Sequence, residues 1–111
     1  MISIIVEEGY AYDYLAILAV KGNKQYYDTI SEHIESQIGR DLHKKITESR
    51  EFHDLYDANV QTFNAVEMAR YGEISAKEVD SCNMTRYNCK VALQNKFFPD
   101  KKVVETKTWR R

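Results

Sequence analysis

The sequence contains a single proline, Pro99, and only four glycines among 111 residues. Because these two residue types most often interrupt helices and form tight turns, their scarcity favours long helices over a strand-rich fold. No run of about 18 apolar residues is present, so no membrane-spanning helix is expected. The sequence therefore predicts an all-α protein without a transmembrane segment.

Cysteine is equally scarce. Cys82 and Cys89 are seven residues apart in a stretch predicted to be helical. At about 1.5 Å of rise per residue their Cα atoms are about 10 Å apart, beyond the roughly 7 Å that a disulfide permits. We expect two free thiols, as in a reducing compartment. The start of the chain, Met1–Glu8, also lacks the basic residues that open a signal peptide. Both features predict an intracellular, cytoplasmic protein.

Neither positive nor negative charge dominates, since the chain has 16 basic and 17 acidic residues. The chain as a whole therefore has no strong field that attracts nucleic acid or acidic lipid. Its length suits one domain that buries about 65% of the unfolded surface, so association would be a natural supplement. We expect one helical domain over residues 1–98, followed by a basic C-terminal arm or edge strand over residues 99–111.

The clearest helix boundary lies at Gly72. This glycine can adopt the left-handed conformation that ends a helix, and Ser75 and Glu78 have the spacing of a capping box at the start of the next one. The short connection predicts two antiparallel neighbours, a helix at about 50–71 and another at about 76–98.

Upstream, one aliphatic residue recurs every fourth position, and a capping box from Thr29 to Glu32 precedes most of the stripe. These positions are Ile30, Ile34, Ile38, Leu42 and Ile46. They predict a helix over 29–46 with a break near 47–49, because each step of four drifts about 40° around a helix. A buried helix is also expected from Tyr10 to Val20. Together the elements predict an antiparallel bundle of three or four helices.

The two ends of the chain have a different character. Residues 4–6 suit either a short strand or a helix start, and residues 102–109 are rich in strand-forming types. Because the second segment is the only plausible partner for the first, we expect that the termini together form a small β element, if one is present.

The sharpest acidic pattern is Glu32-x-x-Glu35 followed by Glu51-x-x-Asp54. It resembles the paired acidic motif of the MazG-like all-α nucleoside triphosphate pyrophosphohydrolases. The resemblance implies Mg²⁺ held by carboxylates from two antiparallel helices, which is the ligand type that this cation requires.

Helical spacing favours a different interpretation of the same four residues. They fall at the margin of the predicted apolar faces or away from them, rather than converging on one cleft. A solvated acidic surface explains that placement. The preferred hypothesis therefore has no catalytic residue and no cofactor, and Mg²⁺ enters only under the enzyme alternative.

The three histidines and two cysteines do not form a zinc motif. His33, His43 and His53 are ten residues apart, so successive members do not share a helix face. No pair of these residues has the short spacing typical of zinc ligands.

The last eleven residues carry a net charge of +4, against −5 for the first hundred. A basic segment ending in tryptophan can contact phosphates and stack on a base, which gives a nucleic-acid-contacting accessory protein as a second alternative. The opposing interpretation is a tail that packs on its own body or on a neighbouring subunit. The candidate contact residues are Lys101, Lys102, Lys107, Trp109, Arg110 and Arg111.

The predicted C-terminal helix carries two apolar stripes, whereas a helix in a minimal bundle needs one. The second stripe should meet either the N-terminal segment or another protein. The preferred function is therefore a small intracellular, non-catalytic protein that acts by protein–protein interaction or self-assembly, with a homo-oligomer or another protein as its partner. The candidate interaction residues are Met84, Tyr87, Val91 and Phe98.

Overall fold

The computed structural model describes residues 5–100, and every regular element in that range is an α-helix. The predicted all-α class is confirmed, and the described residues form a bundle of five helices where three or four were predicted. No helix among the described residues is long and apolar enough to cross a membrane. The helices are α1 (Glu8–Lys21), α2 (Lys24–Ile38), α3 (Arg40–Thr47), α4 (Arg50–Arg70) and α5 (Ala76–Phe97).

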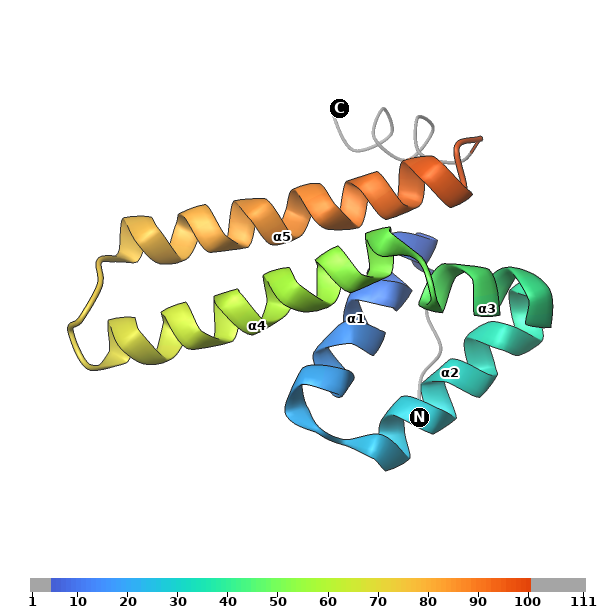
Figure 1. The fold of residues 1–111 in the computed structure, drawn as a ribbon, viewed down its shortest axis with the longest axis horizontal. Helices are drawn as coiled ribbons and strands as arrows, with labels where there is room; N and C mark the ends of the chain where they lie inside the picture. Colours follow the sequence, from blue (N-terminus) through green and yellow to red (C-terminus); the bar gives the residue numbers. More distant parts are fainter. Residues whose placement is uncertain (1–4, 101–111) are drawn as a thin grey trace.

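The two longest helices, α4 and α5, form an antiparallel hairpin (Figure 1). Gly72 has φ 76° in the turn between them, which is the left-handed conformation predicted for it. The side chain of Ser75 accepts a hydrogen bond from the Glu78 amide, and the Glu78 carboxylate accepts one from the Ser75 amide. The predicted boundary and its capping box are both confirmed.

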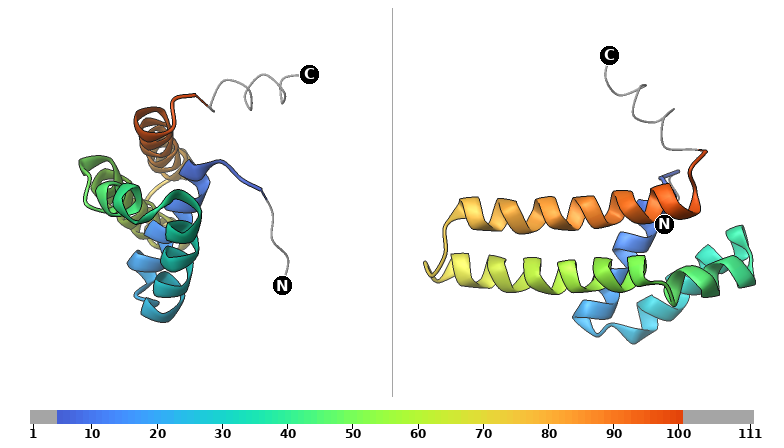
Figure 2. Two further views of the ribbon diagram at one scale, coloured as in Figure 1. Left: turned by 90° about the vertical axis from the view of Figure 1, so that its right-hand side faces the viewer. Right: turned by 45° about the horizontal axis from the view of Figure 1, so that its top comes forward.

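The remaining helices cover one end of this hairpin. Helix α1 crosses it near the start of α4 and the end of α5, and α2 and α3 flank α1 and α4 (Figures 1 and 2). The core forms where they meet. Its largest fully buried apolar members are Tyr12 and Leu15 on α1, Ile46 on α3, Leu55 on α4 and Leu93 on α5.

The prediction of one continuous helix over 29–46 is wrong. Gly39 interrupts it with φ 98° and ψ 154°, and the chain is divided into α2 and α3. The change of direction compensates for the drift of the four-residue stripe, so that Ile34 and Ile46 are both buried in one core although they lie on separate helices. The predicted break near 47–49 is confirmed, because α3 ends at Thr47 and the Ser49 side chain caps α4.

The predicted start of that helix is also wrong. Helix α2 begins at Lys24, where the side chain of Asn23 accepts a hydrogen bond from the Tyr26 amide. Thr29 lies inside the helix, and its hydroxyl donates to the Gln25 carbonyl instead of capping. The preceding Gly22, at φ 70°, ends α1, so two helices meet across two residues.

The predicted β element of the termini falls largely outside the described residues, as does the segment after residue 100. Residues 5–7 are described and precede the first helix, which starts at Glu8.

Replacing Gly39 tests the division between α2 and α3. Its backbone lies in a region that side-chain-bearing residues adopt only at a cost of about 1–3 kcal/mol. We expect Gly39→Ala to lower the free energy of unfolding in urea by that amount. Gly22→Asn is the matched control, because asparagine tolerates the left-handed conformation that Gly22 adopts. We expect this substitution to lower the free energy of unfolding by only a few tenths of the loss in Gly39→Ala. Equal stability of Gly39→Ala and wild type would contradict the assignment.

Candidate functional site

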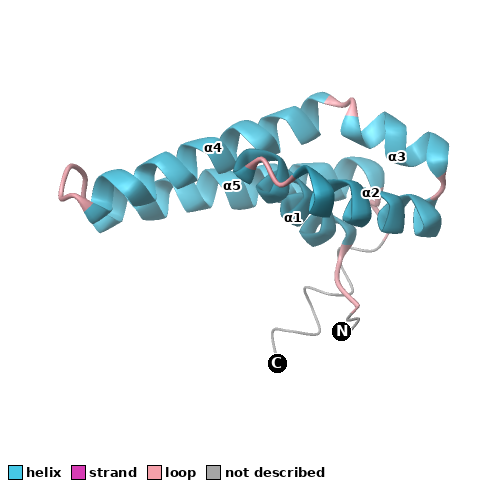
Figure 3. Ribbon diagram, turned by 90° about the horizontal axis from the view of Figure 1, so that it is seen from below, coloured by secondary structure: helices cyan, strands magenta, loops and turns pink. Residues whose placement is uncertain are grey.

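The distal part of the hairpin projects beyond the other helices (Figure 3). We call residues 66–92 of this hairpin the arm; this segment is distinct from the C-terminal segment over residues 99–111. None of residues 66–92 is buried. The radius of gyration is 15.0 Å, whereas a compact domain of about 100 residues has about 13 Å. Beyond the point where α1 crosses, α4 and α5 therefore pack only on each other.

The arm exposes large apolar side chains along its length. The exposed fraction is 40% for Val66 on α4, 74% for Tyr71 in the turn, and 59% and 52% for Met84 and Tyr87 on α5. A helix that projects into solvent is usually polar on all sides, because apolar surface in water is costly. The arm departs from that pattern and is the principal candidate for a binding surface.

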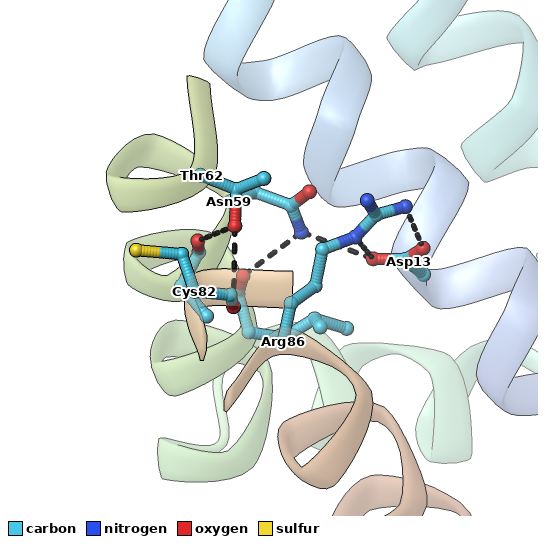
Figure 4. Close-up of polar contacts among 7 residues, drawn as sticks. Asp13, Asn59, Thr62, Cys82 and Arg86 are labelled. Atoms are coloured by element: carbon cyan, nitrogen blue, oxygen red, sulfur yellow. Dashed lines mark hydrogen bonds and ion pairs between the residues drawn. The ribbon is translucent and has the colours of Figure 1, made fainter. Parts of the chain in front are cut away.

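An ion pair fixes α1 across the hairpin at the base of the arm (Figure 4). Arg86 on α5 donates two hydrogen bonds to the Asp13 carboxylate on α1, at 2.7 and 3.2 Å. Asn59 on α4 donates a third to the same carboxylate at 3.0 Å. Asp13 is buried, and its carboxylate raises the pKa of Arg86. One side chain therefore joins three helices.

Two smaller contacts complete this junction. Thr62 on α4 donates to the Ala58 carbonyl within its own helix and lies 3.4 Å from the Cys82 carbonyl on α5 (Figure 4). At the N-terminal end of α1, the Gly9 amide donates to the side-chain oxygen of Gln94 at 2.6 Å. A Cβ on Gly9 would approach atoms of α5 to 3.2 Å, so glycine permits this close packing.

Removing the charge of Asp13 should destabilise the fold strongly. Asp13→Asn leaves the Arg86 guanidinium without its counter-charge, which costs 3–5 kcal/mol for fully buried pairs. The Arg86 side chain is 30% exposed, so we expect about 2 kcal/mol in urea unfolding.

Asp54→Asn is the control for that variant, because it breaks an exposed pair with Arg50 at 3.8 Å. Such pairs contribute about 0.5 kcal/mol or less. Equal losses in the two variants would show that the Asp13 pair is no more than a surface contact.

A second polar cluster connects α1, α2 and α3. The Tyr12 hydroxyl lies 2.7 Å from His43 Nδ1, and Ser31 Oγ lies 2.7 Å from His43 Nε2. The serine–histidine contact has the distance of a nucleophile and its base. The protonation pattern decides whether it can act as one.

Burial raises the pKa of Tyr12, so its phenol keeps the proton and needs an acceptor. His43 Nδ1 is the acceptor within reach, which leaves the proton of the neutral imidazole on Nε2, pointing at Ser31. In this tautomer the histidine donates to the serine and cannot accept its proton. The cluster therefore satisfies buried polar groups and does not activate a nucleophile.

The same cluster makes stability depend on pH. Burial lowers the pKa of His43 below its usual 6.5, although the nearby Glu35 carboxylate partly opposes the shift. As the pH falls through 6.5 toward the folded-state pKa, the unfolded chain takes up a proton that the folded chain does not, and stability declines.

We expect His43→Gln to lose less stability than wild type between pH 7.5 and pH 5.5 in urea titrations, although it is less stable at both. His53→Gln is the control, because His53 is exposed and pairs with Asp57 on its own helix. If wild type and His43→Gln decline equally with pH, a different group controls the acid sensitivity.

The acidic motif is divided between two helices: Glu32 and Glu35 lie on α2, and Glu51 and Asp54 on α4. Helix α2 packs chiefly against α1 and α3, not against α4. Glu51 pairs with Lys96 at 3.1 Å, and hydrogen bonds from its own backbone amide and from Lys96 lower its pKa. Within residues 5–100, no three histidine, cysteine or acidic side chains are placed to hold a metal ion. Within the described residues, the four carboxylates therefore do not come together as one group of ligands.

The four predicted interaction residues separate in the structure. Met84 and Tyr87 are exposed on the arm, and Val91 is half-buried. Phe98 packs in the core, because α5 ends at Phe97 and the next residue has non-helical angles that take it off the stripe. The predicted nucleic-acid contact residues, all in 101–111, lie outside the described residues.

Comparisons with known proteins identify no relative of this chain. No family model matches it, and neither a curated protein nor a solved structure does.

Asp13 and His43, which each connect three helices, were absent from the predicted sites. Asp13 is the only charged residue between Tyr10 and Val20, and this isolation in an apolar stretch was a usable signal for a buried ion pair. His43 lacked such a signal, because its partners Tyr12 and Ser31 are 31 and 12 residues away in the sequence.

Proposed function

We propose that this is a small, non-catalytic intracellular protein that acts by self-assembly through the arm. The observation that carries the proposal is the absence of any buried residue from 66 to 92 in two helices that expose large apolar side chains. Two helices that over most of this length cover only each other are marginal in water, since helices in proteins depend on tertiary packing for most of their stability. A partner on the arm would supply that packing.

The size of the chain supports the same proposal. A domain of this length buries a modest share of its surface, and subunit contacts are a common supplement. The exposed residues of the arm include tyrosine and methionine, which are enriched at protein interfaces. The polar clusters at the other end hold the helices together and offer no arrangement for catalysis.

Charging both sides of the arm should abolish association. We expect wild type to self-associate at micromolar concentration in sedimentation velocity, and Val66→Glu/Met84→Glu to remain a folded monomer. Both residues are exposed, so the variant should unfold in urea within about 0.5 kcal/mol of wild type. An unpaired carboxylate in an interface opposes association much more than it opposes folding of an exposed site.

Tyr26→Glu is the control, because Tyr26 is a similarly exposed aromatic residue on α2, away from the arm. It should associate as wild type does. A wild type that stays monomeric at several hundred micromolar, or a control that dissociates equally, would overturn self-assembly through the arm.

A further inference from the structure

The side of α4 that α1 covers continues along the arm. Asn59 is bonded to Asp13, and the ammonium of Lys21 lies 5.8 Å from the ring centre of Phe63. Because helical residues three or four apart share a face, Val66 lies on the same side of α4, just past the end of α1. It is exposed there.

The side of α5 that contacts α1 extends the same surface along the arm. Arg86 reaches α1 through Asp13, and Lys90 lies 3.7 Å from the ring centre of Tyr10. The same spacing places Asn83 and then Val79 on this side, farther along the arm. We call the surface made by Phe63, Val66, Val79 and Asn83 the open face. It is bounded by α1 at one end and by the turn after α4 at the other.

Opposite charges stand at the two ends of the open face. Lys21, at the C-terminal end of α1, contacts the Phe63 ring, and Glu73 lies in the turn. Both are exposed, and within residues 5–100 neither has an ion-pair partner. A partner for this face should therefore present an acidic group at the α1 end and a basic group at the turn end.

A second copy in the antiparallel orientation meets that requirement. A two-fold axis perpendicular to the arm places α4 against α4 of the second copy, and the turn of each chain against α1 of the other. Because the span from Lys21 to Glu73 is the same in both copies, the two opposite-charge contacts form together. A parallel pairing would place like charges together at both ends, which is unfavourable.

We infer that the open face binds a second copy of this chain, with the two arms antiparallel and Lys21 of each copy opposite Glu73 of the other. The inference rests on the proposed self-assembly and adds the face, the partner and its orientation. It predicts a four-helix bundle at the centre of the dimer, built from two arms and flanked by the two copies of α1.

Charge reversal tests the pairing directly. Lys21→Glu alone and Glu73→Lys alone place like charges together at both ends of the dimer, so each should weaken self-association several-fold at low salt. In a 1:1 mixture of the two variants, the heterodimer regains both opposite-charge contacts. We expect sedimentation velocity to show wild-type association of the mixture, and native mass spectrometry of ¹⁵N-labelled and unlabelled variants to show that heterodimers predominate.

Two single substitutions identify the face. Val66→Glu, on the open face, should dissociate the dimer, and Met84→Glu should not, because Met84 lies nearly opposite Cys82 and Cys89 on the outer side of α5. A mixture no stronger than its components overturns the antiparallel inference. So does dissociation by Met84→Glu but not by Val66→Glu, although self-assembly through the arm would then stand. A wild-type monomer overturns both.

Discussion

The ion pair between Asp13 and Arg86 determines how the rest of the molecule is arranged. Without it, α1 would meet the hairpin through apolar packing, the Gly9–Gln94 hydrogen bond at its N-terminal end and two cation–π contacts. The bidentate geometry, with Asn59 as a third donor, fixes α1 at one level of α4 and α5. That level decides which part of the hairpin is covered and which part is left as the arm. The core at one end and the open face at the other both follow from it.

The sequence predicted correctly those helix ends that depend on hydrogen bonds or backbone angles among residues only a few positions apart. The capping box at Ser75 and the left-handed Gly72 are of this kind, since their hydrogen bonds and angles depend on neighbours in the sequence. Gly39 shows why the rest was missed. The stripe of aliphatic residues keeps its four-residue period before and after Gly39. Only the packing of α2 and α3 against a common core shows that the chain must turn between them.

The candidate site was predictable to a smaller extent, because it depends on contacts between distant residues. Helical spacing identified Met84 and Tyr87 as a stripe outside the core, and both are exposed. The same spacing misplaced Phe98, because the helix ends one residue earlier and the periodicity no longer applies. Open-face residues such as Val66 could not be recognised from the sequence, since an apolar residue on α4 is unremarkable until the position of α1 shows that its side chain stays exposed.

Under the proposed self-assembly, the order of the arm and its association are parts of one equilibrium. Segments with few buried contacts open at low free energy, and the arm has no buried residue between 66 and 92. A partner that binds only the ordered arm stabilises it by mass action, so the same apolar side chains that make the isolated arm marginal favour the assembled one. The base of the arm behaves differently, because Asp13, Arg86 and Asn59 hold it within a single chain. The structure thus combines a buried core with an exposed segment that the proposed self-association would stabilise.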